Sequence, residues 1–372
     1  KLRSALSALG IGMGICMLIA LSGLSRGSLY EVAERWESVD ADLIVFPRGW
    51  GDNAADKSGS GLSDRYADVL RREHADLVER VVPVFTWPME LAGQDQMVAG
   101  VDRGDFAIVA GGRELSKGRL FDADSRFTRW IERKLLTGGD GGGEPVEITA
   151  EQLADPAHDG LEIVIDSRLA AAGDYRVGQT VTAAGHSWEI VGIVPAGAMT
   201  RVMMPRRTAQ FLFASGQITR STLMFVKLRE GADPGPAARA LAGTIKQDVV
   251  PLSRYRGMLL EKFGIMFRYV DAVNAIALVI AFLFIMVTLY TMVLQRTREI
   301  AILKASGASA AFIVRQVLVE SLILTGAGTA VGIGLSFLAG WAIEAIDPLL
   351  TVRITAEWIA LAGGAALLGA VL

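Results

Sequence analysis

The segment Gln295-Arg-Thr-Arg-Glu-Ile-Ala-Ile-Leu-Lys-Ala-Ser-Gly-Ala-Ser309 connects two long apolar stretches and is the most informative part of the sequence for fold and function. It is a polar connection that carries its own helix signals, because Ile300, Leu303 and Gly307 recur on one face at helical spacing. Gly307 is the expected helix stop, and Ser309 is the expected N-cap of the next helix. A structured basic element between apolar helices predicts a docking surface.

Four apolar stretches explain why 51% of the residues are hydrophobic and why the mean hydropathy is +0.38. A membrane-spanning helix needs about 20 predominantly apolar residues. Leu6–Leu24 and Ala272–Leu294 contain no charged residue, whereas Ala311–Ile346 contains Arg315, Glu320 and Glu344. The last stretch, residues 358–372, is apolar to its end. The sequence predicts three complete membrane-spanning helices and a fourth that is truncated.

The first apolar stretch also has features of a secretory signal peptide, with Lys1 and Arg3 as its basic start. The residues that follow, Ser25-Arg-Gly-Ser28, are a poor cleavage site, so a retained membrane anchor is favoured. Because residue 1 is Lys and residue 372 falls in an apolar run, we expect sequence to be missing at both termini.

The short basic segments set the expected orientation, because Lys and Arg concentrate in cytoplasmic loops. Lys1 and Arg3 precede the first apolar stretch, and Arg296, Arg298 and Lys304 follow the second. Both segments are therefore expected in the cytoplasm, in a protein that crosses the membrane several times. The intervening residues are expected in the periplasm; they carry no basic stripe, so nucleic acid is not an expected partner.

The fold class predicted is an α-helical membrane protein with four transmembrane helices and a large α+β periplasmic domain of two subdomains between helices 1 and 2. Strand-helix-strand signals occur near 40–110 and again near 221–253, where Asp233 and Pro234 predict a helix start. Between them, residues near 111–220 are richer in strand signals. This inserted region contains Gly138–Gly143, which reads as a flexible loop.

The expected boundaries follow the chain in order. They are transmembrane helix 1 at 1–26, the periplasmic domain at 27–253, a stalk with transmembrane helix 2 at 254–294, a cytoplasmic helix at 295–310, transmembrane helix 3 at 311–346, a periplasmic loop at 347–357 and the incomplete transmembrane helix 4 at 358–372. The stalk rests on Leu259, Phe263 and Val270, whose helical spacing predicts one helix that continues into the second apolar stretch.

The sequence contains no recognisable catalytic, metal-binding or nucleotide-binding motif. Its three histidines, His74, His158 and His186, share no metal-ligand spacing. The chain is therefore expected not to be an enzyme and to bind no cofactor or metal of its own.

Two polar residues within the apolar stretches need an explanation, because polar groups inside a membrane are costly. Glu320 is interpreted either as a coupling or substrate contact, or as a structural residue paired with Arg315 or close to the headgroups. Asn274 is expected to form an interhelical or interfacial hydrogen bond. Gly328 and Gly332 provide a small-residue surface, either for packing within the chain or for dimerisation.

The segment that ends at Ser309, followed by a Gly-rich stretch, resembles the C-terminal hallmark of the FtsX/MacB-like ABC permeases. Other stretches resemble the same family: Leu2–Gly14 its first-span entry, and Val101-Asp102, Gly118–Phe121, Val177–Thr180 and Ile190–Pro195 its MacB-type periplasmic domain. The resemblance implies two permeases, as copies or as paralogues, associated with two cytoplasmic ATPases that bind ATP and Mg.

In this resemblance the cytoplasmic segment is the coupling helix seated on the ATPase. The residues implied in that contact are Arg296, Arg298, Glu299, Ile300, Leu303, Lys304 and Gly307. The function implied is export of a hydrophobic or amphipathic substrate, driven mechanically from the cytoplasm, with the lipid bilayer around the helices. A membrane-fusion protein and an outer-membrane channel are left open as further partners.

The sequence departs from MacB itself because it contains no ATP-binding motif, so the ATPase is expected on a separate chain or on a removed part. Two alternatives therefore stay open. One is a Lol-type permease that releases lipoproteins. The other is an FtsX-like signalling scaffold that activates periplasmic cell-wall hydrolases, although its outer domain is typically much smaller.

Overall fold

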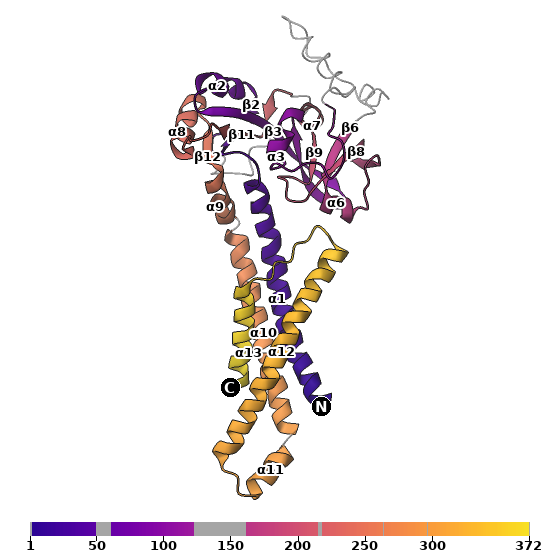
Figure 1. The fold of residues 1–372 in the computed structure, drawn as a ribbon, viewed down its shortest axis with the longest axis vertical. Coiled ribbons are helices and arrows are strands. Elements are labelled where there is room, and N and C mark those ends of the chain that lie inside the picture. The colour runs from indigo at the N-terminus through magenta and orange to yellow at the C-terminus, as the bar shows by residue number, and fades with distance from the viewer. Residues whose placement is uncertain are drawn as a thin grey trace, which may run out of the picture. The chain divides into compact units, whose positions relative to one another are not determined.

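The computed structural model describes residues 2–49, 61–122, 161–214, 218–262, 264–295 and 297–371. The chain divides into two compact units (Figure 1). Unit 1 comprises Lys1–Glu31 with Lys262–Leu372, and unit 2 comprises Val32–Glu261. The predicted loop at 138–143 lies outside the described residues.

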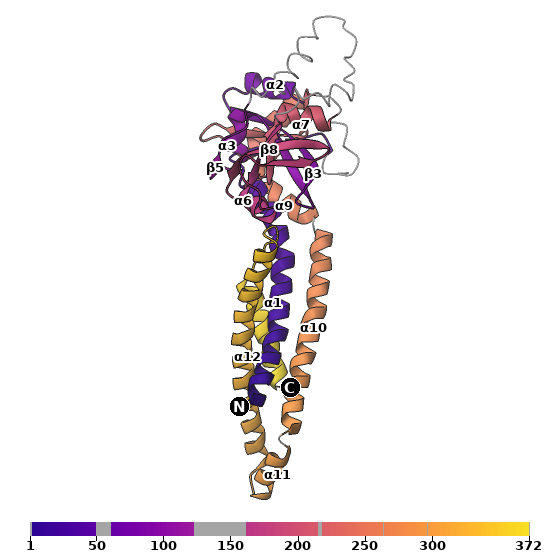
Figure 2. The same cartoon turned by 90° about the vertical axis from the view of Figure 1, so that its right-hand side faces the viewer.

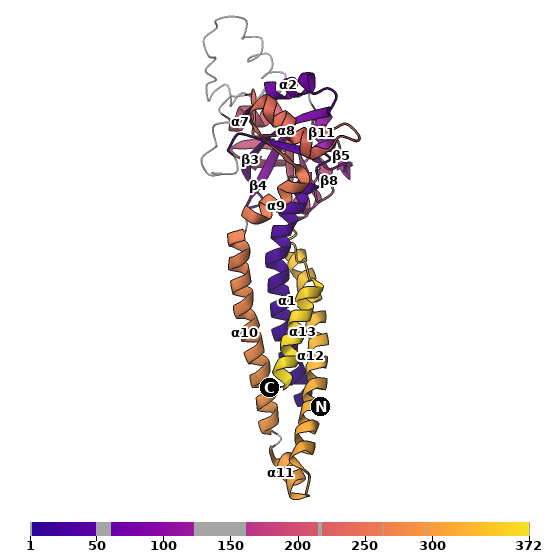
Figure 3. The same ribbon diagram turned by 90° about the vertical axis from the view of Figure 1, so that its left-hand side faces the viewer.

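Unit 1 is built from helices, which Figure 2 and Figure 3 show from two further sides. They are α1 (Leu2–Glu37, whose last residues belong to unit 2), α10 (Gly264–Gln295), α11 (Thr297–Ala305), α12 (Ala310–Ile346) and α13 (Ala356–Val371). Within the described residues, α1 and α12 are long and apolar enough to cross a membrane. A third span is reached if α9 (Leu252–Lys262) and the start of α10 are counted together. The full count of four stays a prediction.

The predicted stalk spans the end of α9 at Lys262 and the start of α10 at Gly264. Phe263 lies outside the described residues, so the single helix that continues from 254 into the apolar stretch stays a prediction.

Glycines bring α1 into close contact with other parts of unit 1. A Cβ atom added to Gly12 would lie 3.1 Å from the carbonyl oxygen of Gly328, and one added to Gly332 would lie 2.7 Å from the carbonyl oxygen of Gly12. These glycines of α12 therefore pack against α1 within the chain. Further along α1, the carbonyl of Gly23 accepts a 3.0 Å hydrogen bond from the amide of Arg353, in the loop that precedes α13.

Unit 2 contains a ten-stranded mixed sheet with a main strand order of β12-β1-β11-β3-β4-β9-β6-β8-β5, while β7 pairs only with β8. Its strands are β1 (Leu43–Phe46), β3 (Val78–Leu91), β4 (Gln94–Val101), β5 (Lys117–Gly118), β6 (Leu161–Asp166), β7 (Thr180–Ala183), β8 (His186–Val194), β9 (Val202–Pro205), β11 (Leu223–Leu228) and β12 (Asp248–Pro251). A separate pair joins β2 (Leu62–Ser63) to β10 (Arg220–Ser221). The described helices of this unit are α2 (Arg65–Glu73), α3 (Phe106–Val109), α6 (Ser167–Ala172), α7 (Arg206–Phe213), α8 (Pro234–Ile245) and nearly all of α9, with a 3-10 turn, η2 (Arg103–Asp105).

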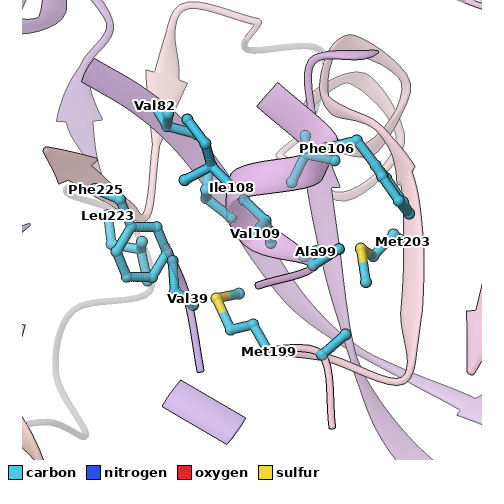
Figure 4. Close-up of a cluster of buried hydrophobic side chains, with 14 of the residues drawn as sticks. Val39, Val82, Ala99, Phe106, Ile108, Val109, Met199, Met203, Leu223 and Phe225 are labelled. Atoms are coloured by element: carbon cyan, nitrogen blue, oxygen red, sulfur yellow. The ribbon is translucent and has the colours of Figure 1, made fainter. Parts of the chain in front are cut away.

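The two strand-helix-strand pieces, β1-α2-β3 and β11-α8-β12, interleave in the sheet as β12-β1-β11-β3. Leu70 of α2 and Leu241 of α8 share a buried core with Val45 and Val226 of the strands. A second core joins these strands to the rest of the sheet through Met203 and its neighbours (Figure 4). Because the sheet and this core are continuous, the division into two subdomains stays a prediction.

Local signals in unit 2 are mostly confirmed. The side chain of Asp233 accepts a hydrogen bond from the amide of Gly235 and caps α8 as expected. The structure also contains a hairpin of β3 and β4, whose turn lies at Ala92 and Gly93, both with positive φ. The inserted region also contains α7, which packs on β3 and β4 and had no clear sequence signal.

A prediction follows from two adjacent glycines after α3. Gly111 and Gly112 have φ of +67° and +71°, but only at Gly111 does an added Cβ meet the Ser38 carbonyl oxygen, at 2.1 Å. Gly112→Ala should lower the free energy of unfolding by about 1 kcal/mol, the usual cost of this backbone conformation. Gly111→Ala should cost at least about 2 kcal/mol more, because the backbone must move. Thermal unfolding of the two variants checks this, and equal losses would contradict it.

Candidate functional site

The helix α11 forms the connection between α10 and α12 (Figure 1). Its end is fixed as the sequence predicted: Gly307 adopts a φ of +87°, and the amide of Ala308 donates a 3.1 Å hydrogen bond to the Leu303 carbonyl. Ser309 caps α12, because its hydroxyl accepts a 3.3 Å hydrogen bond from the amide of Phe312. The connection is therefore a helix with a defined stop and a defined restart.

One face of α11 packs back onto its own chain. Ile300 and Leu303 line a small pocket of about 50 Å³ that is closed by residues of α10 and α12. The other residues that line it are Val293, Glu299, Ile313, Gln316, Val317 and Glu320. We call this the inner face; its apolar contacts hold α11 against the two long helices.

The opposite face of α11 is open. Ile302 has 60% of its surface exposed, and Arg298 and Ala305 are exposed beside it. These three residues share one side of the helix because they follow one another at intervals of four and three residues. We call this the outer face; it offers one large apolar side chain next to a cation.

The predicted coupling residues are therefore divided between the two faces. Ile300 and Leu303 belong to the inner face, whereas Arg298 and Lys304 are exposed to solvent. Glu299 is exposed and also lines the pocket, Gly307 ends the helix, and Arg296 lies outside the described residues. Ile302 was not among the coupling residues predicted from the sequence, although its neighbours at helical spacing, Arg298, Glu299 and Ser306, are polar and indicate an exposed face.

Glu320 of α12 lies at the same junction. Besides lining the pocket under α11, it lines a neighbouring groove of about 610 Å³ on α12, together with Arg315. The rest of this groove is mainly apolar and is lined by Phe312, Gln316, Val319, Ile323 and Leu324. The carboxylate is thus placed beside the inner face of α11 rather than in the middle of the apolar helix.

Asn274 of α10 is placed differently from expectation. Its side chain is 1% exposed, and neither amide atom has a hydrogen-bond partner among the described residues. Among the described side chains, the expected interhelical hydrogen bond is therefore not formed, and the interfacial alternative stays a prediction. Elsewhere in the described chain, no three His, Cys, Asp or Glu side chains gather in a way that could hold a metal ion.

The two faces of α11 predict different effects of alanine substitution on stability. Ile300→Ala with Leu303→Ala removes apolar contacts to α10 and α12, and should lower the free energy of unfolding by about 1–3 kcal/mol for these half-buried side chains. Ile302→Ala removes an exposed side chain and should change it by less than about 0.5 kcal/mol. Thermal unfolding in detergent measures both. A larger loss for Ile302→Ala would show that the faces are assigned the wrong way round.

Comparison with known protein families matches nearly the whole chain. Residues 4–244 match the family described as MacB-like periplasmic core domain. Residues 272–372 match the family described as FtsX-like permease C-terminal.

Individual relatives agree with these matches. The chain is 25% identical over 358 residues to the macrolide export ATP-binding/permease protein MacB of Vibrio parahaemolyticus, covering 92% of this chain and 50% of that protein. It is 26% identical over 372 residues to the protein of the same name from Chlorobium luteolum, covering 92% and 52%. The chain spans about half the length of these curated relatives.

Among solved structures, the periplasmic region of MacB from Actinobacillus actinomycetemcomitans aligns with a TM-score of 0.41 and 14% identity. It covers 61% of this chain and 97% of that one. The assignment rests on the family matches, which together cover both units. The chain belongs to the FtsX/MacB-like family of ABC transporter permeases and carries a MacB-like periplasmic core domain.

Proposed function

We propose that this chain is the permease subunit of a bacterial ABC transporter, in which ATP hydrolysis on a partner drives a conformational change of the periplasmic domain. The observation that carries the proposal is the outer face of α11, in a chain that joins a MacB-like domain to an FtsX-like permease region. A short exposed helix between two long apolar helices is suited to receive a push from a cytoplasmic protein and pass it on.

The ATPase is proposed as the partner for two reasons. The sequence contains no phosphate-binding loop. The curated relatives are named ATP-binding/permease proteins, and the chain matches only about half of their length. ATP and Mg would therefore be bound outside the sequence described here, on a separate subunit or on another part of a longer polypeptide.

The two faces of α11 suggest how the contact transmits force. The outer face, with Ile302 and Arg298, would seat in a groove of the ATPase, where burial of an isoleucine side chain contributes roughly 1.5–3 kcal/mol. The inner face, with Ile300 and Leu303, would carry the displacement to α10 and α12. A rigid helix with two apolar contacts moves as a lever, whereas a flexible loop would absorb the motion.

The substrate proposed is a hydrophobic or amphipathic molecule, expelled from the periplasmic side of the inner membrane. The relatives named for macrolide export support this class. Assembly as a pair of permeases, in a lipid bilayer, belongs to the same proposal. A membrane-fusion protein and an outer-membrane channel would complete the route across the envelope.

The docking proposal is tested with a charge on the outer face. Ile302→Asp should reduce co-purification with the partner ATPase at least tenfold and abolish permease-dependent ATP hydrolysis, because a carboxylate cannot enter an apolar groove without a large desolvation cost. Ile346→Asp is the matched control, since Ile346 is 85% exposed and lies at the other end of α12. Equal behaviour of both variants, at wild-type level, would contradict the proposal.

A further inference from the structure

Arg26 of α1 pairs with Asp271 of α10. Ser22 precedes Arg26 by four residues and Asn274 follows Asp271 by three, so helical spacing places both on the same faces as the ion pair. These four residues of unit 1 are polar. A guanidinium nitrogen of Arg26 lies 2.5 Å from a carboxylate oxygen of Asp271. The same guanidinium lies over the ring of Trp358 of α13, 5.1 Å from its centroid. We call these four residues the polar seam.

The polar seam is only partly satisfied. Ser22 and Asn274 are 0% and 1% exposed. The Ser22 hydroxyl, the Nε of Arg26 and both amide atoms of Asn274 have no hydrogen-bond partner among the described residues. Burying such groups without partners is expensive, and the cost is highest in an apolar surrounding. If the amide of Asn274 served only to pack these helices, an apolar side chain of similar size would increase the free energy of unfolding.

The pairing of α1 with α10 gives the register of the seam. The rings of Tyr30 and Phe267 lie 5.7 Å apart, and the next contact along α1 toward lower numbers pairs Arg26 with Asp271. The two helices therefore run antiparallel in this region. Asn274 follows Asp271 by three residues, which is a rise of about 4.5 Å along α10. This is close to the one-turn step by which packed helices exchange partners in known switches.

We propose that the polar seam has a second register, in which α10 is displaced along α1 by about one turn and Asn274 takes the place of Asp271 opposite Arg26. In that register the amide oxygen of Asn274 accepts a hydrogen bond from the Nε of Arg26, so that two groups left unpaired here satisfy each other. The inference rests on the proposed function, because ATP-driven displacement from α11 is what would move α10.

The surroundings of α10 permit such a step. Next to Asn274, the side chains of Ala277 and Leu278 are partly buried against a core formed by residues of α1 and α13. On its other side, Ile276, Val279 and Ile280 are exposed. Within the described residues, α10 therefore packs through one face and leaves the other exposed, so a sliding displacement changes the contacts of one face only.

Disulfide trapping distinguishes the two registers. The chain has one cysteine, Cys16, so Cys16→Ser gives a clean background. Tyr30→Cys with Phe267→Cys reports the register seen here, and Tyr30→Cys with Val270→Cys reports the displaced one, because Val270 follows Phe267 by three residues. The protein is purified with its ATPase, and each pair is oxidised without nucleotide, with ATP, and with ATP plus vanadate.

The expected result is at least a fivefold shift of crosslinking from the first pair to the second in one of the nucleotide states. Crosslinking of the first pair alone in every state would overturn the proposal, as would crosslinking of neither pair. ATP hydrolysis and co-purification are measured on the same samples. If those are normal while the register never shifts, the second register is wrong and the proposed function stands.

A stability measurement adds an independent test. Asn274→Leu removes the unpaired amide and should raise the midpoint of thermal unfolding by about 2–4 °C, while the nucleotide-dependent crosslink shift is lost. Ser22→Ala, which removes only an unpaired hydroxyl, should raise the midpoint less and leave the shift in place. A fall in the midpoint for Asn274→Leu would show that the amide is satisfied in the resting protein, and the proposal would fail.

Discussion

The helix packing of unit 1 depends on how closely the backbone of α1 approaches its neighbours. Gly12 meets Gly328 and Gly332 of α12 at distances that leave no room for a side chain, and Gly27 meets the backbone at Thr351 even more closely. Close contact of this kind gains dispersion energy where no hydrophobic effect between helices is available. It fixes α1 against α12 and the loop before α13. The helix α10, in contrast, has many exposed side chains.

This difference between the closely packed α1 and the exposed α10 determines what α10 and α11 can do. Much of α10 between Ile265 and Leu294 has exposed apolar side chains, and α11 is the next helix along the chain. A displacement received by the outer face of α11 would therefore reach α10 with little resistance from the rest of unit 1. The incompletely satisfied polar seam lies where such a displacement changes hydrogen-bond partners.

The sequence revealed best those features that depend on neighbouring residues. The Gly307 stop, the Ser309 cap and the Asp233 cap were predicted because each needs only a local backbone conformation and one hydrogen bond. The faces of α11 could not be assigned in this way, since α10 and α12 decide which apolar residue is covered. The same holds for Asn274, because a hydrogen-bond partner on another helix cannot be recognised from its neighbours in the sequence.

The central claim, that α11 receives the ATPase through its outer face, is tested most directly by site-specific photocrosslinking. A photoreactive amino acid placed at position 302 should capture the ATPase subunit, whereas one placed at position 300 should react within the chain, with α10 or α12. Capture of the ATPase from position 300 and not from position 302 would contradict the account.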